Sequence, residues 1–281
     1  MKKINKSIYL LILTLIGAVS VCGASWGVTV GQAVDNTNLI WDGNWYGETT
    51  DTHDGIDAAR RINTGSSSTL LSTTVNGPGT LKFYWKYSGQ GGLTFVDNDI
   101  SVYQVITDLD TTTYEDGQYF AGRNWEKVTY RVGSGKHNLY WSLYPKRYTL
   151  WLDLQHKYST IAWYDVSGFL DQVQWIPAPK VTSTSPKNGV TGVSRTSTIA
   201  IKFSEKIGKS SNWSKITVKN KYGHAVSITK WVSKNTLYIK TNSKRSSYSY
   251  YSVYVPASAV KDSVGNNLAV KYAFKFKTGR Y

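Results

Sequence analysis

Short runs of alternating apolar and polar residues fill the second half of the chain and restrict it to β structure. Within residues 198–203, Ile199, Ile201 and Phe203 take every second position. The same alternation returns at Ile216 and Val218, Val226 and Ile228, Leu237 and Ile239, Tyr251 to Val255, and Tyr272 to Phe276. Neighbouring side chains of a strand point to opposite faces, so each run gives a strand with one apolar side. Roughly six or seven short strands in about 100 residues predict an immunoglobulin-like β-sandwich.

The charge of the chain changes sign near Pro177-Ala178-Pro179. Residues 25–179 hold 11 Lys and Arg against 16 Asp and Glu, whereas residues 180–281 hold 19 against two, Glu205 and Asp262. One folded unit rarely separates its charge at a single point, so the change predicts two modules. We place them at residues 25–177 and 181–279, with a linker at 178–180.

The first module also predicts an all-β fold. Apolar runs at Leu81–Tyr87 and His137–Tyr144 follow glycine-containing segments, Asn76–Gly79 and Gly133–Gly135, that favour turns. A closing strand is expected at Phe169–Ile176. The pattern favours antiparallel hairpins in a jelly-roll-like β-sandwich, which precedes the immunoglobulin-like β-sandwich.

The N-terminus has the pattern of a secretory signal. Lys2, Lys3 and Lys6 precede the uncharged run Ile8–Val21, and small residues follow it. We predict a signal peptide at residues 1–24, with an uncleaved anchor as the alternative. The run is shorter than the ~20 residues of a bilayer span. We therefore expect a secreted, cell-surface or envelope-associated protein without a membrane span in the mature chain.

Four motifs of the second half resemble the Ig-like domains of the S-layer type found in adhesin-like surface proteins of bacteria and archaea. They are SPKNGV at Ser185–Val190, IAIKFSEKI at Ile199–Ile207, YSVYVPASAVKDSVGNNL at Tyr251–Leu268, and FKFKTG at Phe274–Gly279. The resemblance implies an extracellular spacer or adhesive module without catalysis. Such domains usually occur in tandem, whereas this chain carries one.

The first half resembles a jelly-roll module of secreted surface proteins and some secreted hydrolases. The resemblance rests on Trp45, HDGIDAA at His53–Ala59, GPGTLKFYWK at Gly77–Lys86, GSGKHNLYW at Gly133–Trp141 and FLDQVQW at Phe169–Trp175. It implies a carbohydrate-binding or adhesive sandwich. Residues 89–122 and 145–161 depart from the pattern.

Motifs for catalysis are scarce. The chain has four His, none spaced four residues from another, and no Gly-x-Ser-x-Gly elbow or phosphate-binding glycine loop. We therefore predict a non-catalytic adhesin-like or envelope-organising protein. The alternatives are a secreted carbohydrate-binding protein and a cell-wall-active hydrolase that uses a pair of carboxylates.

Carboxylates after a predicted strand end favour a structural calcium site. Asp97, Asp99, Asp108 and Asp110 are the candidate ligands, because calcium takes six to eight oxygen ligands, often from loops. The alternative is that Asp and Asn serve as turn formers there. His53, Asp54 and Asp57 form a second candidate. For Asp171, alone in the closing strand, we expect a structural hydrogen bond.

Aromatic side chains are the candidate sugar-binding groups, since their faces match the apolar faces of sugars. Tyr103, Tyr114, Tyr119 and Tyr148 lie outside the alternating patterns and are the candidates, whereas Trp85, Trp141 and Trp175 lie inside them and are assigned to the core. In the second half, Tyr248, Tyr250 and Tyr254, with Lys244 and Arg245 nearby, are expected to line an outward patch.

The basic surplus of the second half indicates an anionic partner. Cell-wall polymer or surface glycan is expected, with other surface proteins as further candidate partners. Nucleic acid is not expected, because the chain is expected to be exported. Solubilising lysines are the alternative explanation. Asn212-Trp213-Ser214 is a glycosylation triplet, which predicts a modified surface Asn212.

Overall fold

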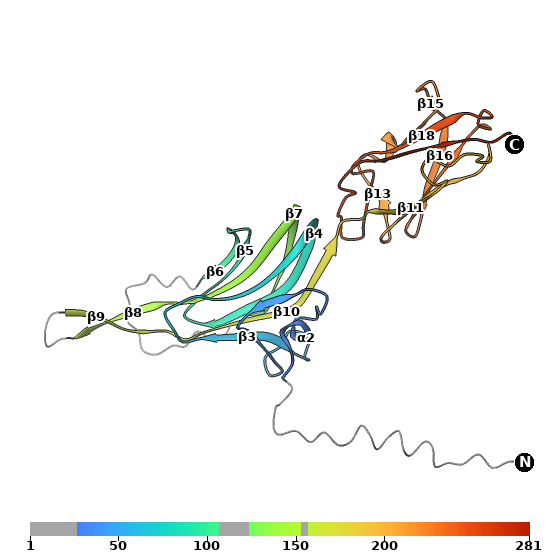
Figure 1. Ribbon diagram of the computed structural model, residues 1–281. Coiled ribbons are helices and arrows are strands. Elements are labelled where there is room, and N and C mark those ends of the chain that lie inside the picture. The colour runs from blue at the N-terminus through green and yellow to red at the C-terminus, as the bar shows by residue number, and fades with distance from the viewer. Residues whose placement is uncertain (1–26, 107–123, 153–156) are drawn as a thin grey trace, which may run out of the picture.

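The computed structural model describes residues 27–106, 124–152 and 157–281, which form an almost all-β molecule with two separate hydrophobic cores (Figure 1). The predicted all-β sandwich class is confirmed. The signal peptide at residues 1–24 lies outside the described residues. The jelly-roll topology and the module boundaries stay predictions.

The first half is built around one large antiparallel sheet in the order β2-β3-β10-β4-β7-β5-β6, with β1 paired to β4. Its elements are α2 (Val30–Ala33), β1 (Trp41–Gly43), β2 (Tyr46–Glu48), β3 (Ala58–Asn63), β4 (Thr69–Gly89), β5 (Gly91–Asp97), β6 (Ile100–Ile106), β7 (Glu126–Pro145) and β10 (Val166–Pro177). A separate hairpin consists of β8 (Arg147–Leu152) and β9 (Lys157–Trp163).

Strands β4 and β7 are long and pair with each other over most of their length, curving together across the first half (Figure 1). The turns predicted at Asn76–Gly79 and Gly133–Gly135 are therefore wrong, because both segments lie inside these strands. Gly77 faces Gly135, and the register shifts between Gly77 and Gly79. A Cβ on Gly77 would lie 1.9 Å from the carbonyl oxygen of Gly133. Glycine here thus permits a close approach of two bent strands and does not reverse the chain.

Aromatic rings fill the core of the first half. Trp141 and Phe83 are fully buried and meet edge to face, with centroids 5.3 Å apart. Trp85 is buried beside Phe83, and Trp175 packs against the cluster from its edge. The assignment of these tryptophans to packing is confirmed.

The second half consists of two four-stranded antiparallel sheets that enclose the second core. One sheet has the order β11 (Val181–Ser185), β12 (Ile199–Phe203), β17 (Thr236–Thr241) and β16 (Ile228–Ser233). The other has the order β15 (Ala225–Val226), β14 (Thr217–Lys219), β18 (Tyr250–Val255) and β20 (Tyr272–Lys277). The remaining elements are β13 (Gly208–Lys209), β19 (Val260–Lys261) and the 3-10 helix η1 (Trp213–Lys215). Ile199, Ile201 and Phe203 are buried, as their alternation predicts.

A hydrogen-bonded joint connects the two halves. Asn266 of the second half donates its side-chain amide to the carbonyl of Ile176 (3.0 Å) and accepts a hydrogen bond from the Thr80 hydroxyl (2.5 Å). Both Thr80 and Asn266 are buried. Arg131 adds a hydrogen bond to the Gly265 carbonyl (3.2 Å). The linker is therefore anchored on the first half at its beginning.

Candidate functional site

The structure describes only part of the predicted binding residues. Tyr114, Tyr119, Asp108 and Asp110 lie outside the described residues. Tyr103 and Tyr148 belong to β6 and β8, at positions whose side chains the structure does not describe. The tyrosine site and the four-aspartate calcium site therefore stay predictions.

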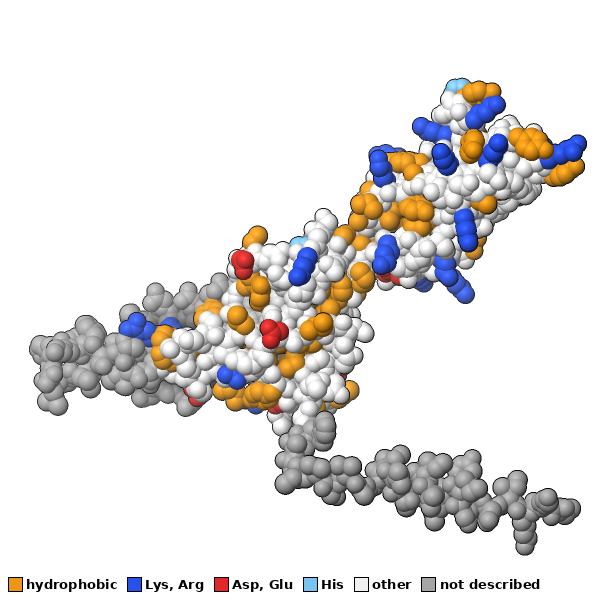
Figure 2. Space-filling model, in the orientation of Figure 1, with side chains coloured by type: hydrophobic (Ala, Val, Ile, Leu, Met, Phe, Trp, Pro, Cys, Tyr) orange, Lys and Arg blue, Asp and Glu red, His pale blue; other side chains and the backbone are white. Residues whose placement is uncertain are grey.

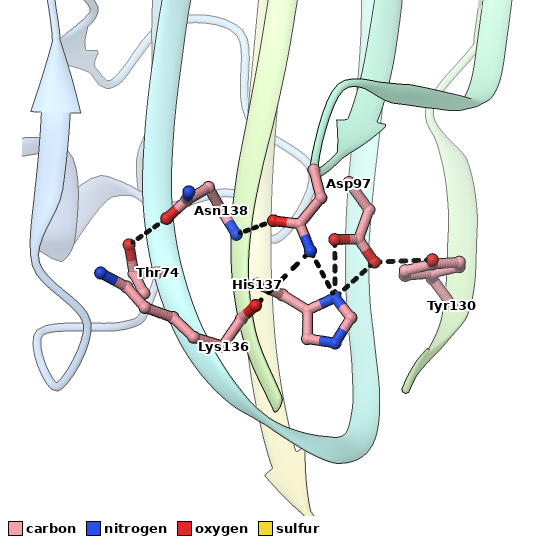
Figure 3. Close-up of polar contacts among 7 residues, drawn as sticks. Thr74, Asp97, Tyr130, Lys136, His137 and Asn138 are labelled. Carbon is pink, nitrogen blue, oxygen red and sulfur yellow. Dashed lines mark hydrogen bonds and ion pairs between the residues drawn. The ribbon is translucent and has the colours of Figure 1, made fainter. Parts of the chain in front are cut away.

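Asp97, one of the predicted calcium ligands, is buried at the end of β5 and takes part in a polar network (Figure 3). The Tyr130 hydroxyl donates to Asp97 Oδ2 (2.8 Å), and His137 Nδ1 lies 2.7 Å from Oδ1. The turn residue Asn98 accepts a hydrogen bond from the backbone N–H of Asn138 (2.9 Å). The neighbouring Asp99 is exposed with a left-handed φ of 67°.

These bonds make Asp97 a structural link between the β5–β6 turn and β7. With Asp97 as a carboxylate, Nδ1 of His137 carries the proton and donates it. Both carboxylate oxygens of Asp97 thus already have partners from its own chain. In the described part of the chain, Asp97 and Asp99 belong to no group of three residues whose ligand atoms converge.

A different set of carboxylates does converge. Asp35, Asp54 and Asp171 each place one carboxylate oxygen within 4.8 Å of those of the other two. Asp35 is exposed, Asp54 is half-buried and Asp171 is completely buried. None of the ion pairs among the described residues involves any of the three. We call these three residues the aspartate triad.

A β-bulge brings Asp171 into this position. The pairing of β10 with β4 shifts between Asp171 and Gln174, and Gln172 has a left-handed φ of 51°. The bulge is fixed from outside, because the Asn36 side chain donates to the Val173 carbonyl (3.1 Å). Bulges commonly re-aim a side chain next to a functional site.

The carboxylate of Asp171 is only partly satisfied. Oδ2 accepts the backbone N–H of His53 (2.8 Å), which confirms the expected structural hydrogen bond, but Oδ1 is buried without a hydrogen-bond partner. Burial raises the pKa of Asp171 to about 6, and the charge of Asp54 raises it further. The backbone N–H groups of His53, Gln172 and Asp54 oppose this rise. Burial and the charge of Asp54 also raise the pKa of Asp35.

The sequence does not predict the triad, because its members are far apart in the chain. Asp54 is predicted as a ligand only together with its neighbours His53 and Asp57, and Asp171 as a lone carboxylate. The available signal is a charged residue between Leu170 and Val173 of the predicted closing strand. Such a residue needs a partner from elsewhere.

In the second half, cations and aromatic rings share the outer face of the sheet that contains β14, β18 and β20. Residues directly opposite each other point to the same face, and the register pairs Lys219 with Ser252, Ser252 with Lys275, and Tyr250 with Lys277. The Nζ atoms of Lys275 and Lys277 lie 5.9 and 5.5 Å from the centroid of the Tyr250 ring. Tyr254 is also exposed. We call Lys219, Tyr250, Tyr254, Lys275 and Lys277 the basic face.

The predicted patch around Tyr248 needs one correction. Tyr248, Tyr250, Tyr254 and Lys244 are exposed, but Arg245 is buried. The Arg245 guanidinium donates to the carbonyls of Ser194 (2.7 Å) and Ser197 (2.8 Å). It therefore holds the loop before β12 and adds no charge to the surface.

Comparison with known proteins identifies the domain that carries the basic face. Residues 176–278 match the family model described as "Bacterial Ig-like domain". These residues form a bacterial Ig-like domain. No curated protein matches the chain. No helix among the described residues is long and apolar enough to cross a bilayer.

Three solved structures that the chain resembles are β-glucuronidases. The enzyme from Ruminococcus gnavus is 12% identical, with a TM-score of 0.19 and coverage of 75% of this chain and 36% of that chain. Those from an uncultured Clostridium sp. and Lactobacillus rhamnosus are each 9% identical, with TM-scores of 0.21. The match covers 87% and 90% of this chain, but only 45% and 46% of those structures. At such TM-scores the likeness carries no argument about function.

The opposite sheet of the Ig-like domain presents an aromatic pair. Trp231 of β16 and Tyr238 of β17 face each other in the register and stack with centroids 5.4 Å apart and planes at 15°. Trp231 is 40% exposed. The sequence argument missed this pair, although Trp231 occupies an outward position between Lys230 and Val232, which point inward.

Asn212, the predicted glycosylation site, precedes η1 and is half-buried. Its side-chain nitrogen donates to the Ala257 carbonyl (2.9 Å). Glycosylation would replace one of the two hydrogens of this nitrogen and leave one N–H to donate. The modification stays a prediction.

Proposed function

We propose that this chain is an exported, non-catalytic surface protein of the adhesin-like or envelope-organising kind. We further propose that its Ig-like domain binds anionic cell-wall polymer or surface glycan. A bacterial Ig-like domain is typical of surface proteins and suggests an adhesion-type role. The basic face is the observation that carries the finer proposal.

Three properties of the basic face support an anionic polymer as its partner. It places three lysines on one flat sheet surface, and β14, β15, β18 and β20 contain no Asp or Glu. The two acids of the domain do not neutralise it, because Asp262 is buried and Glu205 lies outside these strands. Figure 2 shows Lys and Arg side chains spread over this half, with acidic groups gathered on the other. Tyr250 and Tyr254 add apolar surface for sugar rings.

Salt dependence tests the proposal directly. Charge attraction is screened within ~8 Å at physiological ionic strength and within ~3 Å at 1 M salt. The full chain should therefore bind purified bacterial cell wall at low salt and be released near ~1 M. A neutral glucan, which carries no charge, should bind it much more weakly.

Two matched double variants distinguish an effect of the basic face on binding from an effect of the net charge of the domain. K275E/K277E should weaken binding at low salt by roughly tenfold or more, because it reverses the centre of the face. K202E/K240E makes the same change of charge on the opposite sheet and should weaken binding much less. Equal losses in both variants, or binding that is independent of salt, would contradict the proposal.

The exposed aromatic pair favours a second candidate function, the binding of a neutral glycan. Stacked Trp and Tyr rings offer the flat apolar surface that sugars contact. W231A should then abolish binding to a glycan array without changing the binding of anionic wall. An array on which wild type and W231A give the same signals would exclude this candidate.

A further inference from the structure

We propose that the aspartate triad, Asp35, Asp54 and Asp171, binds a divalent cation, with calcium as the fitting ion. The site lies between the bulge of β10 and the loops that follow α2 and precede β3. It differs from the predicted calcium loop around Asp97, and it does not depend on the proposed function of the basic face.

The strongest observation is the buried carboxylate. Asp171 has no exposed surface, and its Oδ1 has no hydrogen-bond partner of normal geometry. One of its carboxylate oxygens lies within 4.8 Å of a carboxylate oxygen of Asp35 and of Asp54. Leaving a buried charged oxygen without a partner costs several kcal/mol, so such groups are normally paired or bind a metal. No cation among the described residues forms an ion pair with the triad. A bound cation supplies the missing partner.

The second observation is that the surrounding charge is of one sign. Asp57 lies close enough for the charges of Asp35 and Asp54 to raise its pKa, after burial itself. Four carboxylates therefore repel one another in one place. Asp54 Oδ1 accepts a hydrogen bond from its own turn, from the N–H of Ile56 (2.7 Å), which does not neutralise this charge. The second oxygen of Asp54 remains for an ion.

The source of the ligands favours calcium over magnesium. The triad oxygens lie within 4.8 Å of one another, close enough to bind one ion. Magnesium demands a near-ideal octahedral shell and keeps several waters. Calcium accepts irregular loops and completes its shell with water and carbonyl oxygens. Three carboxylates, two of them from loops, match this chemistry.

Two variants test the site without disturbing the core. Asp35 is exposed, and Asn tolerates its left-handed φ of 57°, so D35N keeps the backbone. D54N keeps an oxygen for the Ile56 N–H, so its turn persists. D42N is the matched control, because Asp42 is an exposed aspartate of β1 outside the triad.

The experiment is calcium titration of the chelator-treated full chain by calorimetry, together with thermal unfolding. Wild type and D42N should bind calcium and gain roughly 5 °C in melting temperature at saturation. D35N and D54N should each lose at least about tenfold in affinity, and magnesium should bind wild type more weakly. No calcium binding up to about 10 mM would overturn the proposal. So would binding that D35N and D54N leave unchanged, including binding lost only in D99N, which would locate the ion at the Asp97–Asp99 turn.

Discussion

Asp262 of the Ig-like domain and Asp171 of the first half are both buried, but their carboxylates differ in their hydrogen-bond partners. In the Ig-like domain, Asp262 Oδ1 accepts the backbone N–H groups of Val264 (2.9 Å) and Asn266 (2.8 Å), and Oδ2 accepts the Asn266 amide (2.8 Å). In the first half, Asp171 accepts one well-formed hydrogen bond, from the His53 N–H, with the Gln172 and Asp54 N–H groups nearby, and its Oδ1 has no hydrogen-bond partner of normal geometry. The first aspartate is completed by its own loop, whereas the second needs a group from outside the chain.

This difference shows why burial alone does not identify a binding site. A buried carboxylate with several N–H donors is stabilised in its charged form and organises a loop. A buried carboxylate beside other carboxylates is destabilised in its charged form, and a proton or a cation relieves this. The hydrogen-bond partners of a buried carboxylate distinguish a structural role from a binding role, and burial alone does not reveal these partners.

The largest effect is expected for D262A. The substitution leaves two backbone N–H groups and the Asn266 amide without their acceptor, so the free energy of unfolding should fall by roughly 3 kcal/mol. Denaturant unfolding of the full chain measures this loss. A variant as stable as wild type would show that the loop does not depend on Asp262.

In the presence of chelator, we expect D171N to be more stable than wild type, in contrast to D262A. Removing a buried, uncompensated charge should raise the free energy of unfolding at pH 7 by an amount on the order of 2 kcal/mol. In saturating calcium the sign should reverse, because the variant loses an ion ligand. A loss of stability in both conditions would mean that the carboxylate is already satisfied.

The pH dependence of the same variant gives a control. The pKa of Asp171 is raised from 3.8 to about 6, so its contribution to stability is complete below pH 3.8 and is lost as the pH rises to about 6. In chelator, wild type should therefore lose stability relative to D171N across this range. Paired unfolding experiments between pH 3.5 and pH 7 follow the difference directly.

A smaller loss is expected for Y130F, which tests a third buried aspartate. Asp97 lies in the first half, yet it is completed by Tyr130 and His137, as Asp262 is by its loop. Removing the Tyr130 hydroxyl should cost about 1.5 kcal/mol and leave calcium affinity unchanged. Y140F on the same strand is the matched control, because the Tyr140 hydroxyl has no hydrogen bond among the described residues. If Y130F weakens calcium binding, the contrast between Asp97 and Asp171 fails.

The smallest effect is expected from separating the halves. Residues 181–281 expressed alone should fold but lose about 1 kcal/mol, because Asn266 loses Thr80 and the Ile176 carbonyl. Thermal unfolding of this fragment beside the full chain measures the difference. An unfolded fragment would contradict the predicted boundary.

The alternation of apolar and polar residues predicted the strands of the Ig-like domain well, because each strand has one buried and one solvent-exposed face. Ile199, Ile201 and Phe203 are buried in the order that the pattern gives. The turns predicted from the glycines at Gly77 and Gly133 are wrong. Glycine serves both a turn and a close contact of two strands, and only the pairing of β4 with β7 distinguishes them.

The aspartate triad was beyond local patterns for a related reason. Asp35, Asp54 and Asp171 come from three separate segments, and a bulge at Gln172 decides where Asp171 points. A bulge changes the face to which a side chain of the strand points, and the amino-acid composition of the strand does not reveal this. The basic face was easier to predict, because lysines at alternate positions of β20 must share one side.

The position of β10 determines how a pull on the Ig-like domain would act on the first half. The chain leaves β10 at Pro177 and enters β11 after three residues, and β10 lies between β3 and β4, antiparallel to both. Tension applied through the linker therefore runs along β10, at right angles to its hydrogen bonds. Bonds loaded in this shear direction resist together and do not open one by one. A pull on the C-terminal end of the first half would therefore load the hydrogen bonds of β10 in shear.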